Sequence, residues 1–281
     1  MNPTPSFPAL TVFTKPWNSL PLNALADRVA SWGFNGIELP VRPGFQVEPG
    51  TALDVLPGAQ KIFEKRGLRI LSVAAGLDEA TIRACAEARV PILRVMLRVT
   101  ADRGYRGSVE DFQRRANELS PLLRESGVVI GLQNHAGDFV GSAVGLMDAL
   151  APLDPDCARA VLDLGHTALA GEPEPIAIDV AAPRLAMVNL KNAVYRLDAE
   201  SADGVKTWKR QWTNAKAGIT SWAGAVASLR TLPCQVPICL TAEYHDPDGK
   251  FLTGDPVIPL IRDDLAFLRS LLNSNPTASQ P

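Results

Sequence analysis

The chain has few of the features that mark a nucleic-acid-binding, membrane or secreted protein. Its 281 residues carry a formal net charge of −2, which gives no field for holding nucleic acid or an anionic membrane. No apolar run is long enough to span a bilayer. Residues Met1 to Ala9 are rich in proline and lack the basic and apolar regions of a signal peptide. We therefore expect a cytoplasmic protein with no nucleic-acid or membrane partner.

Cysteine is scarce, and the four cysteines form no C-x-x-C pair. Cys85 and Cys239 lie within apolar helix or strand patterns, so we interpret the cysteines as buried, reduced thiols of a cytosolic protein. A nucleophilic Cys239 is not favoured, because no neighbour in the sequence would lower its pKa.

Short β-rich runs alternate with helical patterns along the chain. The runs are largely continuous apolar stretches, as expected for parallel strands buried on both faces. Eight such strands, each followed by a helix, predict an α/β fold of the (β/α)8 TIM-barrel type. A doubly wound sheet is the competitor, but Thr14–Trp17 stands where its glycine-rich fingerprint would be. The predicted strands are Leu10–Thr14, Gly36–Val41, Arg69–Ala74, Ile92–Val99, Val128–Gln133, Ala158–Asp163, Leu185–Leu190 and Pro237–Ala242.

Helical patterns complete one predicted domain over residues 1–273. Leu22–Trp32 has apolar residues at helical spacing and is closed by Gly33. Ser108 to Asp111 has the pattern of a capping box opening a helix that runs to Ser126. The last two helices are predicted at 221–231 and 257–272. Residues 274–281 are polar and are expected to form a flexible tail.

Histidine and tyrosine are also scarce, and their positions are informative. The active site of a TIM barrel lies at the carboxyl ends of its strands. All three histidines and all three tyrosines lie at or just after predicted strand ends, which favours a functional rim with stacking surfaces. They are His135, His166, His245, Tyr105, Tyr195 and Tyr244.

The longest connection, residues 192–218, follows the seventh predicted strand. It interleaves Trp208 and Trp212 with lysines and arginines. Connections of this length in compact domains are usually functional or disordered. This composition suits a lid over a polar ligand, and equally a solvated insertion with a small apolar patch docked on the rim.

Asp163 and His166 are the best-defined candidate pair for a divalent metal site. Asp163 ends a strand, and Gly165 permits a tight turn that brings His166 back toward the same centre. Carboxylate and imidazole suit divalent ions such as zinc or manganese. The alternative is an Asp–His hydrogen bond that stabilises the turn.

Other charged groups at strand ends have two interpretations each. Glu243 follows an apolar run and is predicted as a metal ligand or as a general base with a raised pKa; the alternative is a salt bridge to Lys191 or to an arginine. Glu38 is predicted either to contact the substrate or to form an ion pair with Arg69 or Arg94. Lys191 is predicted to hold a substrate oxyanion or phosphate.

These residues together resemble the xylose isomerase-like TIM-barrel superfamily, the sugar phosphate isomerase/epimerase group. The resemblance covers nearly the whole chain. It begins at Trp32-Gly33-Phe34-Asn35-Gly36-Ile37-Glu38 and continues through Asn134-His135, Asp163-Leu164-Gly165-His166 and Asn189-Leu190-Lys191. It ends at Gly218-Ile219-Thr220-Ser221-Trp222 and Glu243.

The resemblance implies one divalent metal bound by Glu, Asp, His and Glu from four consecutive strands. Asp163 and Glu243 match this set, whereas Gln133 and Asn189 replace the first Glu and the His. An amide is not usefully basic near neutral pH, so a proton shuttle between two glutamates is not expected. The remaining oxygen-rich set would hold manganese, magnesium or calcium loosely, and cobalt is a further candidate. His135 is the predicted replacement for a lost ligand or base.

We therefore predict a sugar or polyol isomerase or epimerase that abstracts a proton next to a carbonyl at the barrel mouth. A keto-sugar lyase or dehydratase, and a metal-free carbohydrate-binding or regulatory barrel, are the alternatives. An apurinic endonuclease is not favoured, because it would require more metal ligands and a basic face. The expected ligand is a carbohydrate or sugar phosphate, and homo-oligomers are common in the resembled group. The predicted catalytic residues are Glu243, His135 and Lys191; the substrate contacts are Glu38, His166, Arg98, Trp17, Trp208 and His245; the metal positions are Asp163, Glu243, Gln133 and Asn189.

Overall fold

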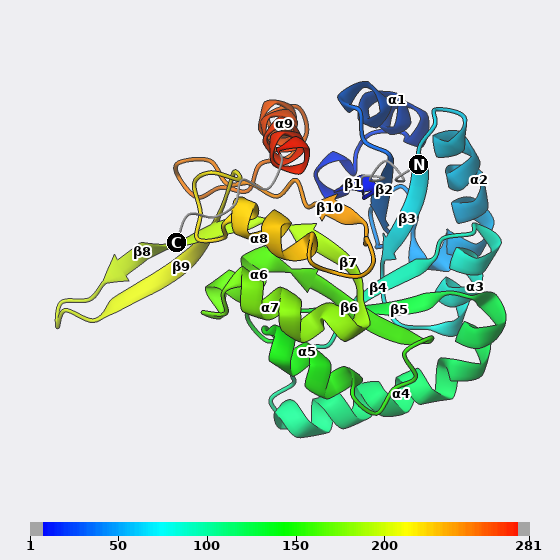
Figure 1. The fold of residues 1–281 in the computed structure, drawn as a ribbon, viewed down its shortest axis with the longest axis horizontal. Coiled ribbons are helices and arrows are strands. Elements are labelled where there is room, and N and C mark those ends of the chain that lie inside the picture. The colour runs from blue at the N-terminus through cyan, green and yellow to red at the C-terminus, as the bar shows by residue number, and fades with distance from the viewer. Residues whose placement is uncertain (1–7, 275–281) are drawn as a thin grey trace.

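The chain folds into a closed barrel of eight parallel strands (Figure 1), which confirms the predicted fold class. The computed structural model describes residues 8–274, and the strand order around the barrel is β1-β10-β7-β6-β5-β4-β3-β2. The barrel strands are β1 (Leu10–Phe13), β2 (Gly36–Pro40), β3 (Arg69–Ala74), β4 (Ile92–Met96), β5 (Val129–Gln133), β6 (Ala158–Asp163), β7 (Leu185–Leu190) and β10 (Ile238–Leu240).

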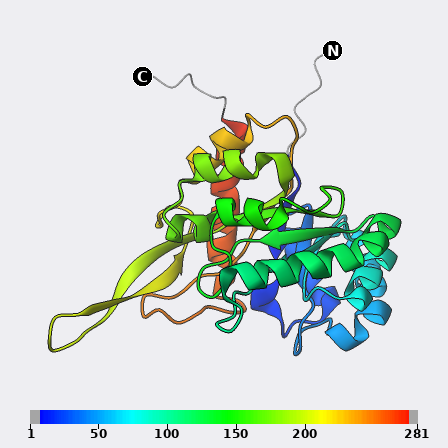
Figure 2. The same cartoon turned by 90° about the horizontal axis from the view of Figure 1, so that it is seen from below.

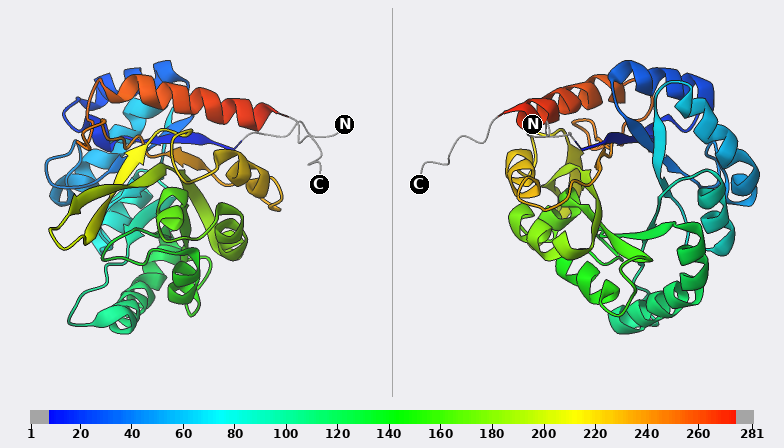
Figure 3. Two further views of the ribbon diagram at one scale, coloured as in Figure 1. Left: turned by 90° about the vertical axis from the view of Figure 1, so that its left-hand side faces the viewer. Right: turned by 45° about the vertical axis from the view of Figure 1, so that its right-hand side comes forward.

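Helices surround the barrel, as the right-hand view in Figure 3 shows. None of the helices within residues 8–274 is both long and apolar enough to cross a membrane. The α-helices are α1 (Leu22–Trp32), α2 (Ala52–Glu64), α3 (Glu79–Glu87), α4 (Gly104–Ser126), α5 (Ala143–Leu150), α6 (Leu164–Leu169), α7 (Glu174–Ala181), α8 (Trp222–Leu229) and α9 (Val257–Asn273).

The strands are buried on both faces, which explains their continuous apolar runs. Every residue of β1 and β2 is buried, including the outward-facing ones, because the helices cover the outside of the barrel. Close strand packing also imposes Gly36. A Cβ atom at this position would lie 2.3 Å from the carbonyl oxygen of Arg69 on the neighbouring strand, so only glycine fits.

The predicted capping box at Ser108 is wrong. Helix α4 begins four residues earlier, at Gly104. Ser108 Oγ donates to the carbonyl oxygen of Gly104 at 2.7 Å, one turn back in the helix, and accepts from the backbone N–H of Thr100 at 3.1 Å. The hydroxyl thus links the preceding loop to the first turn of the helix and does not cap its N-terminus.

The predicted C-terminal tail is described only at its first residue. Ser274 follows α9, and its carbonyl oxygen accepts a 2.8 Å hydrogen bond from Arg230 Nη2. Residues 275–281 of the tail, like residues 1–7 of the proline-rich start, lie outside the described residues, so the flexible tail stays a prediction.

The long connection after β7 is an antiparallel hairpin of β8 (Asn192–Glu200) and β9 (Lys206–Thr213). We call residues 192–213 the β8–β9 hairpin. Its tip extends away from the barrel (Figure 2), whereas Trp212 at its base is buried against the rim. This arrangement corresponds to the predicted insertion with a docked apolar patch, and not to a closed lid.

The interpretation of the cysteines is confirmed for three of the four. Cys85, Cys157 and Cys239 are buried free thiols, and Cys234 is an exposed one. Burial raises the pKa of the Cys85 thiol to about 12 and that of Cys239 well above its usual range. A thiol that stays protonated is a poor nucleophile, so neither residue is suited to covalent catalysis.

Candidate active site

The carboxyl ends of the strands surround one cavity, which we call the mouth cavity. Its walls combine cationic, acidic and neutral polar side chains with only a few apolar ones. The lining residues are Phe13, Lys15, Arg42, Arg94, Met96, Gln133, His135, Asp163, His166, Asn189, Thr241 and Glu243.

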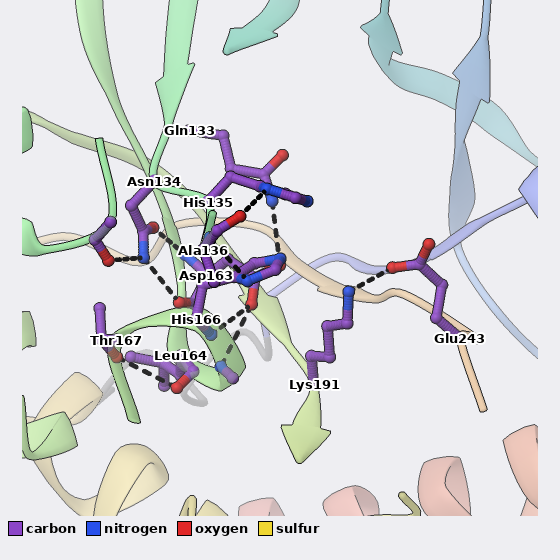
Figure 4. Close-up of polar contacts among 12 residues, drawn as sticks. Gln133, Asn134, His135, Ala136, Asp163, Leu164, His166, Thr167, Lys191 and Glu243 are labelled. Carbon is purple, nitrogen blue, oxygen red and sulfur yellow. Dashed lines mark hydrogen bonds and ion pairs between the residues drawn. The ribbon is translucent and has the colours of Figure 1, made fainter. Parts of the chain in front are cut away.

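Glu243 is held between two ammonium groups. It follows Ala242, whose φ of 54° lies in the left-handed region that residues other than glycine seldom adopt and that is found often at functional sites. Lys15 Nζ lies 2.5 Å from Oε1 of Glu243, and Lys191 Nζ contacts Oε2 (Figure 4). The salt bridge to Lys191 is the alternative that the sequence left open.

The two lysines decide the protonation state of Glu243. Burial by itself would raise the pKa of the carboxyl group, but the charges of Lys191 and Lys15 and their hydrogen bonds outweigh burial. They hold the pKa of Glu243 well below its usual range, so the expected raised pKa is wrong. In this arrangement Glu243 is an ionised carboxylate with little basicity.

A second chain of polar contacts crosses the floor of the mouth cavity. Arg94 Nε lies 2.6 Å from Oε1 of the fully buried Glu38, and Arg94 Nη1 donates to Oε1 of Gln133. Gln133 Nε2 in turn donates to Asp163 Oδ2 at 2.9 Å. The amide of Gln133 therefore links a guanidinium group to a carboxylate, a role for which Gln has both a donor and an acceptor.

Asp163 caps the helix that follows it. Its Oδ1 accepts hydrogen bonds from the backbone N–H groups of Gly165 at 3.1 Å and His166 at 3.2 Å, at the N-terminus of α6. Burial raises the pKa of Asp163 to about 6, although Lys191 acts in the opposite direction. Both oxygens of Asp163 are thus engaged within the protein.

The two histidines of the mouth cavity have complementary tautomers. His166 Nδ1 accepts a 3.1 Å hydrogen bond from the backbone N–H of Ala136, so neutral His166 carries its proton on Nε2. His135 Nδ1 lies 2.8 Å from the carbonyl oxygen of Ala136 and must donate to it, which leaves Nε2 as an acceptor. Burial, reinforced by Lys191, lowers the pKa of His135 to about 4 and that of His166 well below its usual range.

Two buried polar atoms at the mouth cavity have no hydrogen-bond partner among the described residues. They are Nε2 of His166, a donor, and Oδ1 of Asn189, an acceptor. The nearest carboxylate oxygen to His166 Nε2 is Asp163 Oδ2 at 3.9 Å, too far for a hydrogen bond. Unpaired buried groups are costly in a folded protein, so each of these atoms is a place where a bound water or a ligand group is expected.

The metal expected from the family resemblance does not fit these residues. Within residues 8–274 no three His, Cys, Asp or Glu side chains are placed to hold a metal ion. The Nε2 proton of His166 prevents that nitrogen from acting as a ligand, and both oxygens of Glu243 face lysines. The amide oxygen of Gln133 accepts from Arg94, and both oxygens of Asp163 accept from protein groups. Of the predicted four-residue metal set, only the amide oxygen of Asn189 has no partner among the described residues, which is too few donors for a divalent ion.

Three of the residues predicted as substrate contacts do not line the mouth cavity. Trp17 is fully buried, packs against Trp32 and donates from Nε1 to the carbonyl oxygen of Gly254 at 3.0 Å, so it belongs to the core. Arg98 is exposed and lies 3.7 Å from Asp138, outside the lining of the mouth cavity. Trp208 is 59% exposed on the β8–β9 hairpin.

His245 also plays a different part from the predicted one. Its Nδ1 accepts from the backbone N–H of Trp212 at 2.8 Å, and its ring stacks on the Trp212 ring with 6.4 Å between centroids. His245 therefore braces the base of the β8–β9 hairpin. Glu38, beneath Arg94, is likewise a support of the cavity floor.

Sequence reasoning did not include Lys15, Arg42, Arg94 and Trp212 in the site. Lys191 Nζ lies 3.6 Å from the centroid of the Trp212 ring, a cation–π contact. Lys15 stands two residues after β1, which is the position where side chains reach a barrel mouth, so its place in the chain was the available signal.

Comparison with solved structures confirms the architecture. The chain is similar to the IolI protein with a bound zinc atom, with a TM-score of 0.71 and 14% identity over 93% of this chain and 98% of that one. It is similar to D-psicose 3-epimerase from Clostridium cellulolyticum H10, solved with D-tagatose, with a TM-score of 0.70 and 11% identity over 95% and 100%. It is also similar to AsbF of Bacillus anthracis, a probable 3-DHS dehydratase, with a TM-score of 0.67 and 13% identity over 95% and 99%.

These identities are low enough that each likeness shows the fold alone. A comparison with curated protein sequences found no match. The family model described as xylose isomerase-like TIM barrel matches residues 26–271, which is most of the chain. The match supports the resemblance drawn from the strand-end motifs, and the chain belongs to the xylose isomerase-like TIM barrel family.

Proposed function

We propose that this protein is a sugar isomerase- or epimerase-like enzyme that works on a small keto-sugar or sugar acid without a metal ion. The observation that carries the proposal is the pair of ammonium groups, Lys15 and Lys191, on Glu243. They supply positive charge at a position where the family resemblance places a metal-binding glutamate. A carbonyl oxygen that develops negative charge could be stabilised by these ammonium groups in place of a metal.

The charge balance of the site supports an electron-rich or anionic ligand. Lys15, Arg42 and Arg94 line the mouth cavity, and Lys191 is a fourth cation that pairs with the lining residue Glu243. The carboxylates that face these cations are those of Glu38, Asp163 and Glu243. Arg42 forms no ion pair with any described residue, and its half-buried guanidinium lines the cavity. A carboxylate or phosphate group of the ligand would pair with it.

A ligand that enters must displace the lysines from Glu243. The cavity itself has a volume of about 60 Å³, which is smaller than a sugar. When Lys15 and Lys191 turn to the carbonyl oxygen of the ligand, Glu243 loses the contacts that depress its pKa. It can then accept the proton on the carbon next to the carbonyl, and His135 Nε2 is a second acceptor.

The unpaired buried atoms fit the hydroxyl groups of such a ligand. His166 Nε2 would donate to a ligand oxygen, and Asn189 Oδ1 would accept from a ligand hydroxyl. The placement of one donor and one acceptor at the same cavity gives orientation as well as affinity, as is usual for polar groups in small-molecule sites.

A second candidate is a carbohydrate-binding protein without catalysis. Gln133 favours it, because its amide cannot act as a general base, and so does the ion pairing that neutralises Glu243. This protein would hold the same ligands but would not exchange their protons with solvent.

The test uses protein purified without added metal and treated with a chelator. We would screen neutral keto-sugars and keto-sugar acids for thermal stabilisation, and follow exchange of the hydrogen next to the carbonyl by proton NMR in D2O. Exchange that persists with the chelator and is lost in Lys191→Met supports the enzyme. Stabilisation without exchange supports the binding protein. Stoichiometric metal that is required for exchange would refute the metal-free proposal.

A further inference from the structure

The β8–β9 hairpin has one aromatic face and one charged face. In an antiparallel pair, side chains directly opposite one another lie on the same side of the sheet. The pairs on the aromatic side are Ala193 with Trp212, Tyr195 with Arg210, and Leu197 with Trp208, and we call this side the platform face. On the other side, Lys209 Nζ forms an ion pair with Asp198 at 3.0 Å.

The platform face begins at the mouth cavity. Trp212, at its base, contacts Lys191 through its ring face and lies edge-on to His166, with 5.0 Å between centroids. Trp208 is four residues further along the same strand, and a strand rises about 3.3 Å per residue. Trp208 therefore stands roughly 13 Å beyond Trp212 along the strand.

A hollow of about 410 Å³ lies along the platform face. One wall is the turn of Ala136 and Gly137, directly after the cavity residue His135. The other wall is made by Tyr195, Trp208, Lys209 and Arg210. A hollow of this size is within the usual range for small-molecule sites. It adjoins the mouth cavity at residues 135–136 and along the strand from Trp212 to Trp208.

The chemistry of the hollow suits a ring-shaped, polar ligand. Trp208 and Tyr195 are 59% and 50% exposed, and they offer flat apolar surfaces on which a ring can stack. The Tyr195 hydroxyl is held by a 2.9 Å hydrogen bond to the carbonyl oxygen of Leu169, so this side chain is fixed in place. Arg210 brings hydrogen-bond donors to the edge of the hollow, whereas the ammonium group of Lys209 pairs with Asp198 on the other side of the hairpin.

We propose that the platform face is a second subsite, which binds a sugar ring joined by a glycosidic bond to the ligand in the mouth cavity. The preferred ligand is then a glycosylated keto-sugar, and Trp208 is the residue that selects it. This inference rests on the proposed function, because the first ring occupies the cavity described above.

Two features favour a small ligand over a second copy of the chain. The apolar side chains Tyr195 and Trp208 are interrupted by Arg210, and the surface is concave where it meets Ala136 and Gly137. A stable protein interface buries about 800 Å² on each partner, more than a two-stranded ribbon of this composition presents as apolar surface.

The experiment compares D-fructose with isomaltulose, which is fructose carrying a glucosyl group, by calorimetry with the full chain. We expect isomaltulose to bind about five- to tenfold more tightly than fructose, and Trp208→Ala to remove this gain while leaving fructose affinity unchanged. Trp208→Phe should keep most of the gain. Leu197→Ala is the matched control, because Leu197 is exposed on the same face but does not line the hollow.

The outcomes separate this proposal from the proposed function. If fructose binds, isomaltulose binds no better and Trp208→Ala changes neither affinity, the subsite is refuted and the proposed function stands. If neither sugar binds the wild-type protein, both are refuted for these sugars. If Trp208→Ala and Leu197→Ala both lower the mass measured by sedimentation, the platform face joins two copies of the chain, and the subsite is overturned.

Discussion

Replacing Glu243 with glutamine tests the central arrangement of the mouth cavity. The substitution keeps the size of the side chain and removes its charge. In the wild-type protein the carboxylate faces Lys191, whose side chain is 3% exposed, and Lys15, whose side chain is 33% exposed. The variant leaves the buried Lys191 without its counter-charge, whereas Lys15 can turn toward solvent.

The expected loss of stability follows from these exposures. Removing one partner of a buried ion pair costs about 3–5 kcal/mol. Glutamine still accepts one hydrogen bond, and Lys191 keeps its contact with the Trp212 ring, so we expect a loss of about 2–3 kcal/mol in the free energy of unfolding. In a chain of this size the melting temperature should fall by roughly 3–5 °C.

The difference between wild type and variant should depend on pH. The pKa of Glu243 is lower in the folded protein than its ordinary value of 4.5. A carboxyl group with a depressed pKa stabilises the fold fully above its unfolded pKa and progressively less as the pH falls toward its folded pKa. The stability gap should therefore be complete at pH 7 and shrink from about pH 5 downward.

Urea unfolding of both proteins between pH 3 and pH 7 measures this gap. Glu200→Gln is the control, because Glu200 and Lys206 are 3.8 Å apart and about half exposed, and such a surface pair contributes less than about 1 kcal/mol. Equal stability of Glu243→Gln and wild type at pH 7, or a gap that widens on acidification, would refute the reasoning.

Three further predictions concern the cavity and the barrel. Asp163 should titrate near pH 6 in carbon-detected NMR, because burial raises its pKa, and its contribution to stability should decline as the pH rises through that value. Exhaustive treatment with a chelator should leave the melting temperature unchanged, since the cavity has no suitable donor set. Gly36→Ala should lower the free energy of unfolding by at least about 2 kcal/mol in urea titration, because its Cβ would meet Arg69.

Much of the fold could be predicted from the sequence. The bounds of β3, β6 and β7 match the predicted ones, because an apolar run buried on both faces is a local signal. The start of α4 was predicted four residues too late. The sequence Ser108 to Asp111 has the residue types of a capping box, but Ser108 bonds to Gly104 within the helix. The hairpin was missed because its tip, 201–205, has the polar composition of any solvated loop.

The candidate site was predicted only in outline. The polar strand ends identified Gln133, Asp163, His166 and Glu243 as neighbours, because the carboxyl ends of parallel strands meet at one end of a barrel. The replacement of two metal ligands by amides was also visible in the sequence. The sequence did not show the protonation state of Glu243 or the hydrogen bonds of Gln133, because both depend on which cations face these residues in the folded barrel.

The sequence by itself determined the barrel and the end of it at which the polar groups gather. Only the tertiary structure decided that Lys15 and Lys191 hold Glu243, that Arg94 meets Gln133, and that Trp212 closes one wall. Lys15 and Glu243 are 228 positions apart in the chain. Their contact exists because β1 pairs with β10 where the barrel closes. As a result, Glu243, which the sequence predicts as a metal ligand, instead forms ion pairs with Lys15 and Lys191.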